Sequence, residues 1–208
     1  MEDKSAAVRT FSFLLITLTA YYLLWQFFSA RTGLPVYYYG RLIELLSIGL
    51  FAALAIWTPM RFEQMGILVP KRVLFCSLAV GGAVALGFAL LLGLVAALRG
   101  HTPLFSPAIN GDISRVTYIL VAPLQEILAK SVMYYSFELC FDGKHPHAVN
   151  AMCALSFALF HVVYGLRMML LSMLLCLITG WMFRKFRCVW GCAVVHFALG
   201  FFPPCFGF

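Results

Sequence analysis

Long apolar stretches alternate with short polar connections along the whole chain. A helix needs about 20 mostly apolar residues to cross a bilayer, because lipid cannot hydrogen-bond an exposed backbone. Seven stretches meet or approach this length, at residues 10–30, 42–58, 73–98, 116–137, 148–166, 168–183 and 188–202. The pattern predicts an all-α fold, a polytopic transmembrane helical bundle with about seven spans, within a range of six to eight.

The composition agrees with this pattern. Of the 208 residues, 63% are hydrophobic and 11% are charged, whereas about 25% of the residues in a soluble domain are charged. A water-soluble fold is therefore excluded. The length fits one unit and no low-complexity tract divides the chain, so we expect a single integral membrane domain over residues 1–208.

The net charge of +7 comes from basic residues between the apolar stretches. Anionic headgroups and the positive-inside rule account for basic residues in such places. With seven spans, nine Lys and Arg residues fall on the side of the N-terminus and five on the other side, which predicts a cytoplasmic N-terminus. No basic stripe or aromatic platform indicates nucleic-acid binding, so the expected partner is the lipid bilayer. A chain this compact is typical of a bacterial inner-membrane protein.

Three ionisable residues in the second half of the chain lie inside three different predicted spans: Glu126, His161 and His196. Placing such a group at the centre of a membrane costs about 2.5–3.5 kcal/mol, so it normally faces the interior of the bundle. A single buried histidine is usually structural. Two histidines and a carboxylate from separate helices instead predict a shared polar site.

Other polar residues have simpler interpretations. Glu126 and Lys130 are four residues apart with the acid first, which favours an ion pair on one helical face; such a pair can also be merely structural. Glu44, Glu138, His145 and His147 lie near span ends or in a connection. We expect water to reach these four side chains.

Three segments in this region resemble the motifs of the CAAX-protease and bacteriocin-processing family of intramembrane proteases. Residues 122–130, with Gln125, Glu126 and Lys130, are similar to its first motif, two glutamates followed after three residues by arginine. Phe157 and His161 match the second motif, a phenylalanine four residues before a histidine. Residues 180–196 resemble the approach to the third motif, whose histidine is followed four residues later by asparagine or aspartate. The catalytic-motif region covers about residues 116–202.

This resemblance implies an intramembrane endopeptidase with Glu126, His161 and His196 as catalytic residues. A buried glutamate and a histidine would activate water, and third-motif residues would stabilise the oxyanion. We favour Glu126 as the base, because a carboxylate in a low-dielectric pocket is an effective general base near neutral pH. Gln125, Lys130, Phe157 and Gly200 would support them. The expected substrate is a membrane protein or a lipidated or tail-anchored protein.

Three motif positions depart from the family pattern. Gln125 replaces a glutamate, Lys130 an arginine, and Gly200 an asparagine or aspartate. These departures leave open a catalytically inactive relative that acts as a membrane scaffold or chaperone. A small proton-coupled transporter is a further alternative, because intramembrane acids and histidines can relay protons.

No cofactor is expected, although zinc is an alternative. Glu126, His161 and His196 would form a His₂Glu set of the kind that binds catalytic zinc. The HExxH pattern of many zinc proteases is absent from the sequence. A metal-free mechanism is therefore the main prediction.

Overall fold

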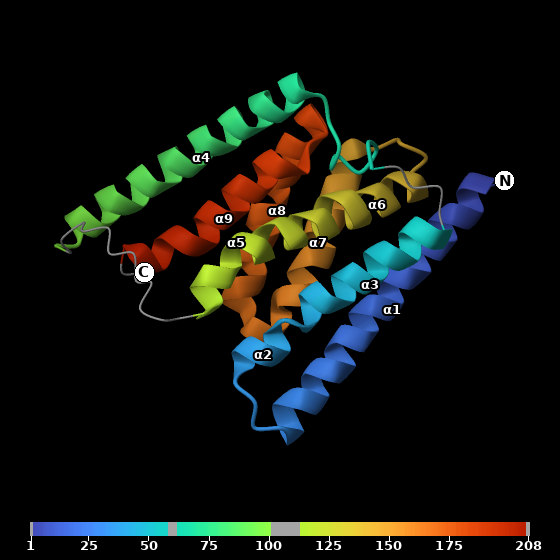
Figure 1. The fold of residues 1–208 in the computed structure, drawn as a ribbon, viewed down its shortest axis with the longest axis horizontal. Helices are drawn as coiled ribbons and strands as arrows, with labels where there is room; N and C mark the ends of the chain where they lie inside the picture. The colour runs from blue at the N-terminus through green and yellow to red at the C-terminus, as the bar shows by residue number, and fades with distance from the viewer. Residues whose placement is uncertain (1, 58–61, 101–112, 207–208) are drawn as a thin grey trace.

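The computed structural model describes residues 2–57, 62–100 and 113–206, and every regular element among them is helical. Figure 1 shows their arrangement. The α-helices are α1 (Glu2–Arg31), α2 (Val36–Gly40), α3 (Leu42–Trp57), α4 (Lys71–Leu98), α5 (Ile113–Glu126), α6 (Tyr135–Cys140), α7 (Pro146–His161), α8 (Leu166–Phe186) and α9 (Val189–Cys205). A π-helix, η1 (Ile127–Tyr134), joins α5 to α6, and a 3₁₀ turn, η2 (Val162–Tyr164), follows α7. The all-α fold class is confirmed.

Five stretches within the described residues are long and apolar enough to cross a membrane: Ser5–Arg31, Tyr38–Trp57, Lys71–Leu98, Pro146–Tyr164 and Leu166–Phe186. They coincide with five of the seven predicted spans. The last predicted span, residues 188–202, is the shorter apolar helix α9. The protein is an integral membrane protein with a polytopic helical bundle.

The predicted span at residues 116–137 is helical but not one uninterrupted α-helix. Pro123 lies inside α5, where it has no N–H for the helical hydrogen bond and its ring crowds the preceding turn. The chain then takes the wider π-helical turn from Ile127 to Tyr134. Such π segments are rare and occur frequently at functional sites. Glu126 therefore lies at the junction between the α and π segments.

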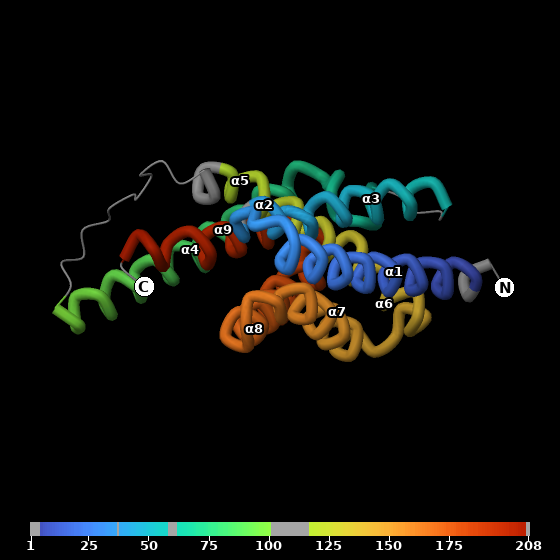
Figure 2. The backbone as a smooth tube through the Cα atoms, turned by 90° about the horizontal axis from the view of Figure 1, so that it is seen from below, coloured from blue at the N-terminus to red at the C-terminus, as the bar shows by residue number. Residues whose placement is uncertain are grey.

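The helices divide into a peripheral set and a central set. In the most apolar window of α1 and of α4, 11% of the residues are buried, compared with 44% for the span that contains α7 and 39% for α8. Helix α4 packs along α9, and α1 packs against α3 and α6. Figure 2 shows α7 and α8 paired as a layer of their own on one face of the molecule. In a bilayer, α1 and α4 present most of their surface to lipid.

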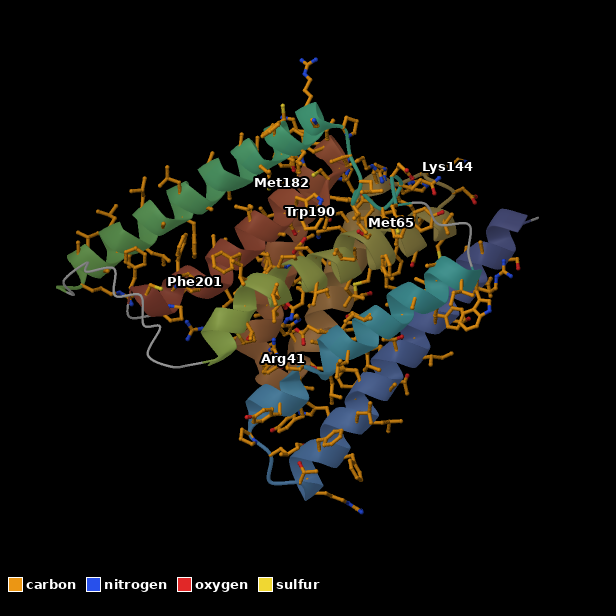
Figure 3. The ribbon with its side chains drawn as sticks, viewed as in Figure 1. Arg41, Met65, Lys144, Met182, Trp190 and Phe201 are labelled. Carbon is orange, nitrogen blue, oxygen red and sulfur yellow. The ribbon has the colours of Figure 1, made fainter. Side chains whose placement is uncertain are left out.

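The connection that precedes α4 is fixed to the central helices by three hydrogen bonds. The Ser131 hydroxyl donates to the Met65 carbonyl at 2.7 Å, and the Trp190 indole donates to the Ile67 carbonyl at 2.9 Å. The Val189 amide donates to the carbonyl of Gly66 at 3.0 Å. Figure 3 labels Met65 and Trp190 at this end of the bundle. These bonds tie the first half of the chain to η1 and α9.

Candidate active site

Glu126 and His196 form a buried carboxylate–imidazole pair between α5 and α9. Nδ1 of His196 lies 2.9 Å from Oε1 of Glu126. Glu126 is completely buried and His196 is 3% exposed. Since an ionised carboxylate only accepts hydrogen bonds, Nδ1 of His196 carries the hydrogen of this contact, and in the neutral imidazole Nε2 then has the lone pair. Oε2 of Glu126 has no hydrogen-bond partner within the described residues.

His161 lies at the end of α7 and shares an aromatic neighbour with His196. The Phe157 ring centroid is 4.6 Å from that of His161 and 5.9 Å from that of His196. Nδ1 of His161 donates to the Phe157 carbonyl at 2.9 Å, because a carbonyl oxygen can only accept. The tautomer is thereby fixed with Nε2 unprotonated. The structure thus brings Glu126 and His196 into contact, and His161 shares the Phe157 ring with His196 as a neighbour.

The predicted ion pair between Glu126 and Lys130 does not form. The fully buried ammonium of Lys130 donates to the Cys176 carbonyl at 2.8 Å and contacts the Cys176 sulfur at 3.0 Å. No ion pair between Lys130 and Glu126 is present in the described part of the chain. The spacing argument assumed a regular α-helix, whereas Lys130 lies in the π-helical turn and extends towards α8.

Gln125 is bonded to a carboxylate from a distant helix. Its Nε2 donates to Oε1 of Glu44 in α3 at 2.7 Å. Glu44 is 5% exposed, so the expectation that water surrounds its side chain was wrong. Arg41 lies 3.6 Å from the same oxygen, at the junction of α2 and α3 labelled in Figure 3. The sequence contained a signal for this contact, because Glu44 is an acid inside the predicted span 42–58. We expected it at the end of that span, where water could reach it.

The other polar residues set aside in the sequence lie away from this site. His145 and His147 are exposed, as expected. Glu138 is partly exposed and forms a bidentate ion pair with Arg187, with one N–O distance of 2.7 Å. This pair ties α6 to the turn between α8 and α9.

The missing third-motif side chain leaves a space that a tyrosine fills. A Cβ atom added at Gly200 would collide with the hydroxyl and ring of Tyr118 in α5. The Tyr118 ring also packs edge-on against His196, with a centroid distance of 6.2 Å and an interplanar angle of 70°. A phenolic hydroxyl therefore occupies the volume beside Gly200.

The alternative zinc set does not assemble in this arrangement. No group of three His, Cys, Asp or Glu side chains in the described parts of the chain could hold a metal ion. Glu126 and His196 already contact each other, while His161 directs Nδ1 to its own helix. Zinc needs three convergent protein ligands for a catalytic site, which these side chains do not provide here.

An apolar groove of about 460 Å³ lies between α4, α5 and α9. It is lined by Leu74, Leu78, Ile119, Pro123, Trp190, Ala193, Val194 and Phe197. Pro123 precedes Glu126 by three residues, and Ala193 precedes His196 by three. The groove therefore runs within one helical turn of the carboxylate–imidazole pair.

This arrangement has the components of acid–base chemistry. A histidine whose Nδ1–H is held by a carboxylate can accept a proton at Nε2, and the carboxylate stabilises the resulting positive charge. Burial strengthens that interaction, because the surroundings screen it weakly. The pair can therefore deprotonate water or polarise a carbonyl group.

A comparison with protein families agrees with the motifs. Residues 113–202 match the family model Rce1-like, described as type II CAAX prenyl endopeptidase Rce1-like. No curated protein and no solved structure is significantly similar to the chain. The matched segment runs from the start of α5 into α9 and contains Glu126, His161 and His196. The match over residues 113–202 is therefore consistent with the CAAX-protease family that the motifs resemble.

Proposed function

We propose that this protein is an intramembrane endopeptidase that hydrolyses a peptide bond in a membrane-embedded or membrane-proximal protein segment. Glu126 and His196 form the pair at the centre of the reaction, and His161 assists from its position beside Phe157. Lipidated and tail-anchored proteins are candidate substrates. We place the protein in a bacterial inner membrane with its N-terminus in the cytoplasm.

The observation that carries this proposal is the 2.9 Å contact between Glu126 and His196. An ionisable pair inside an apolar bundle costs more free energy than a pair of apolar side chains would, so its presence favours a functional role. A purely structural pair would need no third titratable neighbour. Here the Phe157 ring contacts both His196 of the pair and a second histidine, His161.

The apolar groove supports a membrane-embedded substrate. Its lining includes no charged side chain, so it suits a segment that arrives through the lipid rather than from water. Its closeness to Glu126 and His196 would place the bound segment beside the reacting groups. Free cofactors are not needed for this chemistry, because the carboxylate and imidazoles can move the proton themselves.

The test compares the termini of membrane proteins in cells that express four forms of the chain. These are the wild type, Glu126→Gln, His161→Ala and the matched control Glu63→Gln, whose carboxylate is exposed and outside the site. We expect mass spectrometry to find new C-termini with the wild type and the control, and to lose them with the two site variants. Identical termini in all four samples would remove the proposal.

The scaffold alternative makes the opposite prediction. An inactive relative would keep its cellular effect in Glu126→Gln and lose it when the helix packing is disturbed. The three motif departures motivate this alternative. Two of them have a polar neighbour, the Glu44 carboxylate beside Gln125 and the Tyr118 hydroxyl beside Gly200, which favours the enzyme.

A further inference from the structure

Glu44 offers a carboxylate at the point where the first motif lacks one. The family pattern has a glutamate at position 125, and this chain has a glutamine. The amide of Gln125 is hydrogen-bonded to Oε1 of Glu44 at 2.7 Å. Glu44, which comes from α3, therefore contacts the residue that precedes Glu126, and its carboxylate lies within electrostatic range of His196.

Glu44 is a buried carboxylate whose charge is only partly compensated by its neighbours. A carboxylate this deeply buried is costly unless it is compensated. Arg41, 3.6 Å away and partly exposed, provides part of that compensation. Oε2 of Glu44 is buried and lacks a hydrogen-bond partner among the described residues. That oxygen is left available to a small polar molecule such as water.

Glu44 is also less deeply buried than Glu126. Glu126 has no exposed surface, and its partner His196 is 3% exposed. Glu44 keeps a small exposed fraction of 5%, and its partner Arg41 has a side chain that is 32% exposed. Glu44 is therefore paired with a residue that reaches the surface, whereas Glu126 is not.

We propose that Glu44 is a second catalytic carboxylate of this site, in place of the glutamate missing at position 125. The proposal rests on the proposed function. The water oxygen attacks the peptide carbonyl carbon while its proton moves to Oε2 of Glu44. When the carbon–nitrogen bond breaks, the same proton passes to the leaving nitrogen, giving a carboxylic acid and an amine. Glu126 holds His196 in the required tautomer throughout.

The test measures cleavage of a segment found to be cut by the wild type, using Glu44→Gln and Glu44→Ala. In Glu44→Gln the new amide oxygen can still accept the hydrogen bond from Gln125, so the substitution keeps the packing and removes only the charge. We expect both variants to lose about 100-fold in kcat, the usual scale for a general base, with melting temperatures in detergent close to that of the wild type. The double variant Glu44→Gln/Gln125→Glu, which returns the acid to position 125, should recover at least about tenfold.

The outcomes separate this inference from the proposed function. Full activity of Glu44→Gln beside an inactive Glu126→Gln would overturn only the role of Glu44. A defect in Glu44→Ala without one in Glu44→Gln would show that the carboxylate merely positions Gln125, and it would also overturn the proposal. Absence of any cleavage by the wild type would overturn both.

A separate observation concerns Gly200, and from it we infer that the Tyr118 hydroxyl stabilises the oxyanion. The family pattern has an asparagine or aspartate at position 200, and the Tyr118 hydroxyl occupies the place where that side chain would begin. Tyr118 contacts His196 and lies in electrostatic range of Glu126. A hydroxyl donor held there can stabilise a developing negative charge.

Tyr118→Phe isolates the hydroxyl, because the ring contacts with His196 and Phe197 remain. We expect kcat to fall by about 100-fold, as for the loss of one oxyanion donor, with little change in KM or melting temperature. Tyr118→Ala/Gly200→Asn should be at least about tenfold more active than Tyr118→Ala, because the asparagine then has room to donate. Wild-type kcat in Tyr118→Phe, or no recovery in the double variant, would overturn this role.

Discussion

The peripheral helices α1 and α4 differ sharply from the central elements α5, η1 and α9. Most side chains of α4 are apolar and many face outward, including Leu86, Leu90 and Leu94. The central elements instead bury three ionisable side chains, those of Glu126, Lys130 and His196. An apolar helix gains no hydrophobic free energy by moving from lipid into the protein interior. Helix α4 can therefore leave most of its surface in lipid. The buried ionisable residues of the central elements therefore indicate a function beyond spanning the membrane.

Glu44 crosses this division. It belongs to α3, in the first half of the chain and outside the matched family segment of residues 113–202. Its carboxylate nevertheless bonds Gln125, inside that segment. The first half therefore does more than shield the second half from lipid, because it contributes an ionisable group to the polar interior.

The largest effect should come from Glu126→Gln. The glutamine removes the negative charge that orients and polarises His196, so we expect cleavage to fall by about 10³-fold, within the usual range for acid–base groups. Cleavage is measured on a segment processed by the wild type. Activity within about threefold of the wild type, far from the usual loss of an acid–base group, would mean that the central polar pair is structural.

His161→Ala should have the next largest effect. His161 makes no hydrogen bond to Glu126, because its Nδ1 is bonded to the Phe157 carbonyl, and it shares only the Phe157 ring with His196. We therefore expect a loss of about 10²-fold, smaller than that of Glu126→Gln. His147→Ala, which changes an exposed histidine at the start of α7, is the matched control and should be fully active. A larger loss in His161→Ala than in Glu126→Gln would reverse the proposed ranking.

Lys130→Met should mainly affect stability. The substitution removes the hydrogen bond to the Cys176 carbonyl and should lower the free energy of unfolding by about 1–3 kcal/mol. Because Lys130 makes no ion pair with Glu126, cleavage measured well below the melting temperature should change by less than about tenfold, which is below the range of about 10²–10⁴-fold for an acid–base group. Lys185→Met, at an exposed position, serves as the control in thermal unfolding. A loss of cleavage as large as that of Glu126→Gln would make Lys130 part of the reaction.

Leu90→Ala on the outer face of α4 should have the smallest effect. Leu90 is 66% exposed and faces lipid, where its removal leaves no cavity. We expect a change in unfolding free energy of less than about 0.5 kcal/mol and unchanged cleavage. A melting temperature as low as that of Lys130→Met would show that this face packs against protein.

The sequence predicted the helical bundle because spans follow directly from apolar length. It also predicted that Glu126 and His196 face one another, as they do in the structure, since ionisable residues inside spans are few. The sequence did not predict that a π-helical turn interrupts the span at 116–137. Pro123 marks the place, but neither composition nor hydropathy distinguishes a π-helical turn from an α-helical one.

The contacts of Glu44 and Tyr118 could not be predicted for a different reason. Each depends on how helices distant in sequence pack, and no local pattern sets that packing. Glu44 lies 81 residues from Gln125, and Tyr118 is 82 positions from Gly200 in the chain. The motif departures at Gln125 and Gly200 indicated that something was missing, but not which helix would supply it.

The most direct test of the central claim is the source of oxygen in the new C-termini. Membranes from cells expressing the wild type or Glu126→Gln are incubated in water enriched in ¹⁸O, and peptide C-termini are analysed by mass spectrometry. Hydrolysis by activated water predicts C-termini that carry ¹⁸O with the wild type and are missing with Glu126→Gln. The same labelled C-termini in both samples would contradict the account.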